Sequence, residues 1–156
     1  VYKRQALIDA DGVIGQVIEP GLKTSLAVLI SDPGHAIPVE VNRNGLRTIA
    51  FGTGEIAELD IPYLPNNADI EAGDLLVTSG LGGKFPPGYP VAVVESVTRI
   101  PQEPFAVVKA TPSAMLNQVR EIMLVEPVRK DERMTDEITT DAAADETADN
   151  TVTEDE

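Results

Sequence analysis

The segment at residues 78–94, TSGLGGKFPPGYPVAVV, restricts the fold of this chain more than any other stretch. Glycine reaches backbone conformations that other residues avoid, and proline fixes φ and removes a hydrogen-bond donor. A loop rich in both turns sharply and stays stiff in places. Strand-like apolar runs lie before it, at 75–78, and after it, at 90–98. The segment therefore predicts a long connection between two β-strands.

The composition favours an all-β fold. Hydrophobic residues make up 42% of the 156 residues but aromatic residues only 4%, without tryptophan. A core built from Val, Ile, Leu and Ala leans towards strands, and the twelve glycines and twelve prolines indicate many turns. We expect strands at 6–9, 13–19, 25–30, 38–42, 46–51, 55–61, 75–78, 90–98, 105–110 and 121–125.

Local signals refine this expectation. Asn44-Gly45 predicts a hairpin, and the continuously apolar run at 25–30 is expected at the centre of a sheet. Thr111 and Pro112 predict the N-cap and first turn of one short helix at 112–119. The prolines and asparagines of 62–67 indicate a boundary between two subdomains, at 6–62 and 63–126. The first five residues fit no element, so we expect the natural chain to begin earlier.

The charge of the chain is uneven. Of the net −14, residues 127–156 carry −8, with few large apolar side chains. Such a segment cannot bury enough surface to offset its ordering entropy, so we predict a disordered acidic tail at 127–156. The acidic balance disfavours nucleic acid and anionic lipid as partners. No run approaches the roughly 18 apolar residues of a membrane helix.

The sequence offers little for catalysis or metal binding. Without cysteine there is no disulfide, thiolate zinc site or cysteine nucleophile. A Ser79–His35–Asp32 triad can be written, but no nucleophile-elbow pattern surrounds any serine. We interpret the only histidine, His35, as part of a polar loop. Asp69, Glu71 and Asp74 lack the spacing of a calcium loop, and we expect no catalytic residue, metal or cofactor.

The glycine–proline loop, at residues 79–90, supports two interpretations. It is either a barrel turn needed only for shape or an exposed surface for a protein partner. In the second case the binding residues are Leu81, Phe85, Pro86, Pro87 and Tyr89, held in shape by Gly80, Gly82, Gly83 and Gly88. We expect Gly82 and Gly83 to adopt dihedrals that would strain any residue with a side chain. A stiff loop loses little entropy on binding, which suits a protein contact. Phe85 is either exposed for binding or a plug of the core.

The chain resembles the MreC family of rod shape-determining proteins. The likeness is carried by DADGVIGQVIEPG at 9–21, by the strands and hairpin at 24–54, by 112–125, and above all by LDIPYLPNNADIEAGDLLVTSGLGGKFPPGYPV at 59–91. It covers about residues 6–126. One departure is Ala92, where the family often has glycine.

The resemblance implies two small β-barrels, the first of them incomplete here, on the periplasmic side of the bacterial inner membrane. It also implies an N-terminal membrane helix and a coiled coil, neither of which this chain contains. The role implied is that of a non-enzymatic scaffold of cell-wall elongation. Its partners would be an elongation-specific penicillin-binding transpeptidase, other membrane proteins of the rod complex, and further copies of itself.

Two alternatives from other classes remain open. Two small β-barrels are also the architecture of trypsin-like serine proteases, which would require His35 to be catalytic. A peptidoglycan-binding module is the other, although it would need exposed aromatic rings to stack on sugars, and this chain has few.

Overall fold

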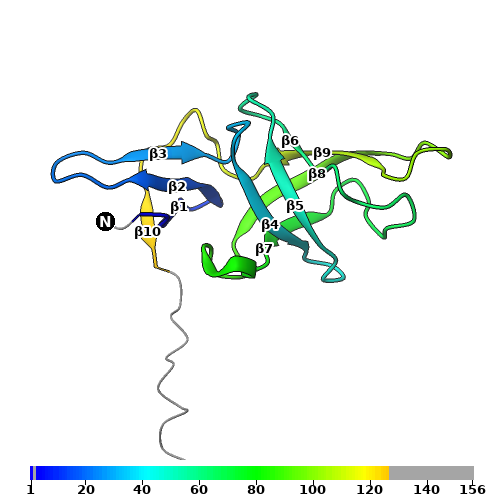
Figure 1. The fold of residues 1–156 in the computed structure, drawn as a ribbon, viewed down its shortest axis with the longest axis horizontal. Coiled ribbons are helices and arrows are strands. Elements are labelled where there is room, and N and C mark those ends of the chain that lie inside the picture. Colours follow the sequence, from blue (N-terminus) through cyan, green and yellow to red (C-terminus); the bar gives the residue numbers. More distant parts are fainter. Residues whose placement is uncertain (2, 127–156) are drawn as a thin grey trace, which may run out of the picture.

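The fold is all-β, as predicted, and consists of an open sheet beside a closed barrel (Figure 1). This computed structural model describes residue 1 and residues 3–126, so the predicted acidic tail lies outside the described residues. The strands are β1 Ala6–Ile8, β2 Val13–Glu19, β3 Leu26–Leu29, β4 Ala36–Val41, β5 Arg47–Gly52, β6 Leu59–Asp60, β7 Leu75–Thr78, β8 Pro90–Thr98, β9 Val107–Pro112 and β10 Met123–Val125. Within these residues, no helix is long and apolar enough to cross a membrane.

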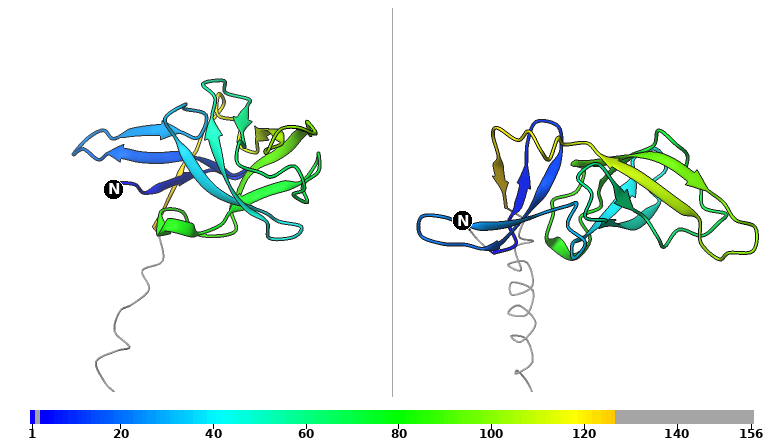
Figure 2. Two further views of the ribbon diagram at one scale, coloured as in Figure 1. Left: turned by 45° about the vertical axis from the view of Figure 1, so that its right-hand side comes forward. Right: turned by 90° about the horizontal axis from the view of Figure 1, so that it is seen from above.

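Only one of the two expected barrels closes. Strands β4 to β9 form a six-stranded barrel in the order β4-β5-β6-β9-β8-β7, whereas the other strands form an open sheet in the order β10-β1-β2-β3. The expected boundary at 62–63 does not coincide with this division, because the barrel takes β4, β5 and β6 from before it and β7, β8 and β9 from after it. Figure 2 shows the sheet and the barrel as neighbouring lobes.

The first and last strands of the described chain pair with each other. Ala6 lies opposite Val125 and Ile8 opposite Met123 in the antiparallel pair of β1 and β10. The barrel is therefore inserted, in sequence, between β3 and β10 of the sheet. The aliphatic core runs through both lobes, and only three phenylalanines and three tyrosines are available to it.

The hairpin predicted at Asn44-Gly45 is confirmed. It joins β4 to β5, with Pro38 opposite Ile49 in the register of the pair. Gly45 adopts a φ of 73°, a left-handed conformation that glycine reaches without strain. The side-chain oxygen of Asn44 accepts a hydrogen bond from the Leu46 amide, 3.0 Å away, which fixes the turn.

The helix predicted at 112–119 is wrong. Strand β9 continues to Pro112, which lies opposite Ala92, and the Ser113 amide then donates to the Val91 carbonyl. Proline is tolerated there because a strand end does not need its missing donor. The chain beyond has to cross from the barrel to the sheet, and a helix rises only about 1.5 Å per residue. The only helical turn in the described residues is the 3-10 turn η1, Leu81–Gly83.

The apolar run at 25–30 is not central. Strand β3 is an edge strand that pairs with β2 alone in the described part of the chain, and Leu26 is 55% exposed. An apolar run predicts a strand but does not say how many partners that strand has.

Candidate functional site

The glycine–proline loop is fastened to the barrel by Thr78, a fully buried residue at the end of β7. Its hydroxyl donates to the Pro86 carbonyl at 2.5 Å and accepts from the Tyr89 amide at 2.9 Å. The Thr78 carbonyl accepts from the Gly88 amide, and its own amide donates to the Tyr89 carbonyl. One buried threonine thus binds both ends of the second half of the loop.

Left-handed glycines shape the loop between these contacts. Gly80, Gly82, Gly83 and Gly88 have φ values of 76°, 77°, 65° and 91°. This confirms the prediction that Gly82 and Gly83 adopt dihedrals that would strain a residue with a side chain. A side chain at such positions costs about 1–2 kcal/mol of backbone strain.

Phe85 is a plug of the core and not an exposed binding residue. Its side chain is 4% exposed and belongs to the main hydrophobic cluster. The ring meets His35 edge to face, with centroids 6.1 Å apart. The prediction that Phe85 leads an exposed surface is corrected by this burial.

The remaining loop residues divide between core and surface. Leu81 points outward with 47% of its surface exposed, and Pro87 is also exposed. Pro86 and Tyr89 are half-buried, and Tyr89 packs against the core. Of the five predicted binding residues, the structure thus leaves Leu81 and Pro87 most available to a partner.

His35 is buried and not part of a catalytic triad. Burial lowers the pKa of His35; the positive charge of Lys84 adds to this effect and Asp32 opposes it. The Nδ1 atom of His35 has no hydrogen-bond partner, so Asp32 does not orient the imidazole as a triad requires. The Asp32 carboxylate instead accepts from the Gly34 amide at 2.8 Å.

Leu81 forms one wall of an open groove on the barrel. The groove has a volume of about 450 Å³ and lies over the outer face of β4 and β5. We call it the β5 groove; it is lined by Pro38, Arg47, Thr48, Ile49, Tyr63, Leu81 and Gly82. The hydroxyl oxygen of Thr48 is buried and lacks a partner. The groove therefore combines a largely apolar lining with one exposed cation, Arg47.

An aromatic row continues from the groove. Tyr63 is 59% exposed and packs edge to face between Phe51, at a centroid distance of 5.7 Å, and Phe105, at 6.3 Å. Few aromatic residues exist in this chain, and half of them meet here. Such pairs hold each ring in place, so the row presents a preformed apolar surface.

Hydrogen bonds from Arg99 hold the segment that carries Tyr63. The Arg99 guanidinium donates to the carbonyls of Asn66, Ala68 and Ile70, at 3.0, 3.1 and 3.0 Å. The side-chain amide of Asn66 in turn donates to the Ile100 carbonyl at 2.7 Å. These bonds tie the 63–70 segment to the loop between β8 and β9.

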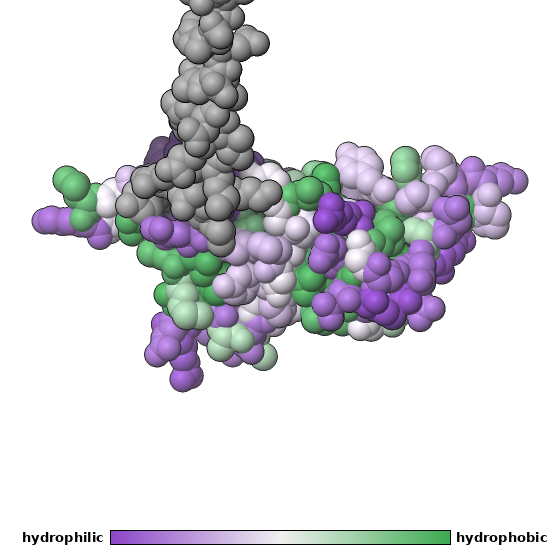
Figure 3. Space-filling model, turned by 90° about the horizontal axis from the view of Figure 1, so that it is seen from below, coloured by the Kyte–Doolittle hydropathy of each residue, from purple (hydrophilic) through white to green (hydrophobic). Residues whose placement is uncertain are grey.

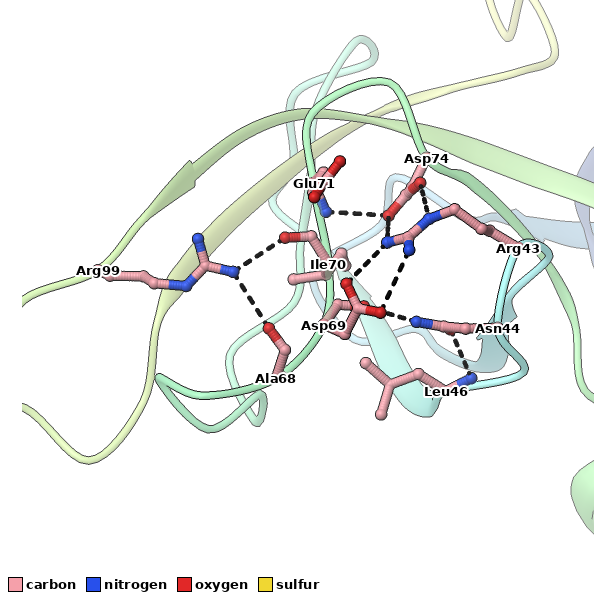
Figure 4. A network of polar contacts seen from close by, with 9 residues as sticks. All are labelled: Arg43, Asn44, Leu46, Ala68, Asp69, Ile70, Glu71, Asp74 and Arg99. Carbon is pink, nitrogen blue, oxygen red and sulfur yellow. Dashed lines mark hydrogen bonds and ion pairs between the residues drawn. The ribbon is translucent and has the colours of Figure 1, made fainter.

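A second cation, Arg43, holds the same segment from its other side (Figure 4). Arg43, from the β4–β5 turn, binds both Asp69 and Asp74 with contacts of 3.0 Å. Its hydrogen bonds lower the pKa of each carboxylate and raise the pKa of the guanidinium. The two aspartates thus neutralise an arginine. Among the described residues, no group of three or more acidic, His or Cys side chains could hold a metal ion.

Sequence reasoning did not single out Ile49, Phe51, Tyr63 or Phe105 as binding residues. A signal existed for two of them, because Ile49 and Phe51 alternate with Ala50 in a predicted strand and so share a face. The contacts of Tyr63 with Phe51 and Phe105 join three distant parts of the sequence, and no local pattern predicts them.

Comparison with known proteins gives consistent matches. The family model described as rod shape-determining protein MreC, barrel core, matches residues 1–126. The cell shape-determining protein MreC of Haemophilus influenzae is 52% identical over 130 residues, which are 83% of this chain and 37% of that protein. The chain thus spans little more than a third of this curated relative.

Solved structures agree. MreC from Pseudomonas aeruginosa is 50% identical, with a TM-score of 0.78 over 80% of this chain and 81% of that one. A complex between the penicillin-binding protein PBP2 and MreC from Helicobacter pylori also matches, at a TM-score of 0.65 over 82% of each chain. At 21% identity, the second match shows the shared fold alone.

Proposed function

The chain belongs to the MreC family of rod shape-determining proteins, and on that premise we propose that it is a non-enzymatic scaffold of cell-wall elongation. In this proposal it lies on the periplasmic side of the inner membrane, anchored by an upstream helix. It binds a peptidoglycan transpeptidase and associates with further copies of itself and with other membrane proteins of the rod complex. The complex of PBP2 with MreC from Helicobacter pylori supports the choice of a transpeptidase.

The observation that carries the proposal is the β5 groove with its aromatic row. Tyr63 and Leu81 are both exposed, and both line the same largely apolar groove. Exposed aromatic rings beside an apolar pocket are typical of residues that dominate protein–protein binding energies. The glycine–proline loop and the hydrogen bonds of Arg99 hold both residues in place before binding, which reduces the entropy lost on association.

The part of the glycine–proline loop that contributes is Leu81 with Pro87, while Phe85, Pro86 and Tyr89 support them from below. Asp69, Asp74 and the buried His35 have no catalytic role in this proposal. Binding, and not turnover, is the activity expected of the groove.

The test is the affinity of the full chain for the periplasmic part of the transpeptidase. Leu81→Ala and Tyr63→Ala should each weaken binding by about 1–2 kcal/mol or more, close to tenfold. Leu81→Ala should leave the melting temperature unchanged, whereas Tyr63→Ala should lower it slightly because two ring contacts are lost. Leu22→Ala is the matched control, because Leu22 is a fully exposed leucine in the turn between β2 and β3. Equal effects of Leu22→Ala and Leu81→Ala would contradict the proposal.

A further inference from the structure

The first half of the glycine–proline loop, residues 80–85, is attached to the barrel core through one side chain. Phe85 is 4% exposed and is the only buried residue between Ser79 and Pro90, and no residue of η1 is buried. The turn η1 is the short green coil at the bottom of Figure 1, and Figure 3 shows that side of the molecule, where apolar side chains reach the surface among polar ones. The position of Leu81 at the β5 groove therefore depends on Phe85.

The hydrogen bonds of the loop divide it at Pro86. Thr78 binds the backbone of the second half, from Pro86 to Tyr89. In the first half, the amides of Leu81 and Gly83 donate to groups of the same loop, at 3.3 and 3.2 Å, and these bonds do not reach the barrel. Residues 80–85 can thus move while the contacts of Thr78 stay in place.

Phe85 packs against a buried imidazole. His35 is 7% exposed, and its ring meets that of Phe85 edge to face. The Nδ1 atom is buried, and no group of the described chain forms a hydrogen bond with it. The His35 amide donates to the Asp32 carbonyl at 2.9 Å, and the His35 carbonyl accepts from the Gly52 amide at 3.2 Å. Of the two rings, that of Phe85 is therefore the less firmly held.

We propose that His35 is a proton-sensitive latch on this loop. When the imidazole takes up a proton, Phe85 leaves its pocket, residues 80–85 move outward, and Leu81 no longer lines the β5 groove. The last step rests on the proposed function, because the transpeptidase is the partner assigned to that groove. Binding is then strong while His35 is neutral and weaker in mild acid.

Protonation is unfavourable in the closed loop, the arrangement that the structure shows, because the new charge is buried. A proton on Nδ1 would lack an acceptor, since a phenyl ring has no lone pair to offer. The charged side chains that act on His35 are Asp32, from its own connection, and Lys84, from the loop, whereas Gly52 of β5 contributes only its backbone. Departure of Phe85 admits water to the imidazole and removes this penalty.

The direction of the pH dependence follows from these contacts. Burial lowers the pKa of His35 in the closed loop; Asp32 opposes this effect and Lys84 adds to it. In the open loop the ring is solvated and titrates near 6.5. The open loop thus binds the proton more tightly, so the closed loop is favoured above about pH 6.5 and loses stability below that value. His35 is the only histidine of the chain, which makes it the one side chain with an ordinary pKa in this range.

Amide hydrogen exchange of the full chain, followed by NMR, tests the latch. Between pH 7.5 and 5.5, the protection factors of Leu81 and Gly83 should fall by up to about tenfold for each unit by which the pKa of His35 differs between the two loop states. The amides of Gly88 and Tyr89, which Thr78 holds, should keep their protection. An equal fall at all four amides would replace the latch by a general loosening, and constant protection while the imidazole titrates would overturn it.

Substitution of the histidine is the matched control. His35→Leu removes the titrating group, so protection of Leu81 and Gly83 should become independent of pH. His35→Gln, which is polar and uncharged, serves the same purpose where leucine disturbs the fold. A pH dependence that persists in both variants would assign it to another group and overturn the proposal.

The two neighbouring charges should change the response in opposite directions. Lys84→Gln removes a positive charge that disfavours the proton in the closed loop, so the loss of protection in acid should be smaller. Asp32→Asn removes a negative charge that favours the proton, so the loss should be larger; asparagine keeps an oxygen for the Gly34 amide. A response that shifts the same way in both variants would contradict the electrostatic basis of the latch.

The affinity for the periplasmic part of the transpeptidase connects the latch to function. The Kd of the unmodified chain should rise about threefold between pH 7.5 and 5.5, as the fraction of closed loops falls. His35→Leu should lack this rise, whereas titration of the partner would affect both chains equally. Equal pH dependence of the two chains would overturn the control of binding by His35.

Leu81→Ala at pH 7.5 then separates the two proposals. Weaker binding of this variant would keep the β5 groove as the site and refute the latch alone. Unchanged binding would refute the groove together with its regulation.

Discussion

The ring of Phe85 meets the ring of His35 edge to face, with centroids 6.1 Å apart, although one belongs to the glycine–proline loop and the other to the connection before β4. This contact fixes the loop to the barrel. It also couples the loop to a buried group that can take up a proton.

Truncation of the phenylalanine should destabilise the fold. Phe85→Ala removes a ring that is 4% exposed, and the cavity left behind should cost about 3–5 kcal/mol of unfolding free energy. Denaturant unfolding measures this loss. Leu81→Ala, four residues away on the exposed side of the same loop, is the control and should change stability little. A negligible loss in Phe85→Ala would place the ring outside the core.

Stability should fall in mild acid because of His35. Burial lowers the pKa of His35 in the folded chain, whereas the unfolded chain titrates near 6.5. Below that value the unfolded state binds the proton more tightly, so the contribution is complete above about pH 6.5 and decreases as the pH falls. Unfolding free energies measured between pH 7.5 and 5 should show this slope, and His35→Leu should reduce it. An equal slope in His35→Leu would assign the pH dependence to other groups.

Two glycines of the loop should separate backbone strain from crowding. Gly80 and Gly82 have nearly the same φ, 76° and 77°. A Cβ at Gly82 would meet no atom within 4 Å, whereas one at Gly80 would lie 3.1 Å from the Pro87 ring. Gly82→Ala should therefore lower the unfolding free energy only through backbone strain, by about 1–2 kcal/mol. Gly80→Ala should lower it further, because its Cβ also crowds the Pro87 ring. Equal losses in chemical denaturation would show that crowding by Pro87 contributes nothing.

Arg99 should act as a positioning residue for Tyr63. Its planar guanidinium reaches three carbonyls at once, which a lysine ammonium cannot reproduce. Arg99→Lys should speed amide hydrogen exchange in residues 63–70 and weaken transpeptidase binding, although Arg99 does not line the β5 groove. Arg47→Lys, whose nearest carboxylate is 3.7 Å away, is the control for hydrogen exchange. Unchanged exchange in Arg99→Lys would show that other contacts hold the segment.

Local patterns predicted the strands better than their partners. The hairpin at Asn44-Gly45 and the left-handed glycines Gly82 and Gly83 follow from the conformations these residues allow, and both predictions are confirmed. The edge position of Leu26 could not be predicted, because it depends on which strands lie nearby. The helix expected after Pro112 failed for a similar reason: pairing with Ala92 overrode the capping signal.

The candidate site was predicted only in part. Leu81 is exposed as expected, but the direction of Phe85 is set by a pocket beside His35, fifty residues earlier in the chain. From the sequence alone, a ring between glycines and prolines can point either into the core or outward to solvent. Tyr63 became a site residue only through its contacts with Phe51 and Phe105.

The pairing of β1 with β10 also sets an order of events during folding. All six barrel strands lie between Ala36 and Pro112, so the barrel can assemble without any strand from the end of the described chain. The sheet is complete only once Met123–Val125 is in place, because β1 has β2 on one side and β10 on the other. Until then β1 offers an unpaired apolar edge to the surroundings. We therefore expect the sheet to be the slow, high-contact-order step of folding and the part most exposed to mispairing with other unfolded chains.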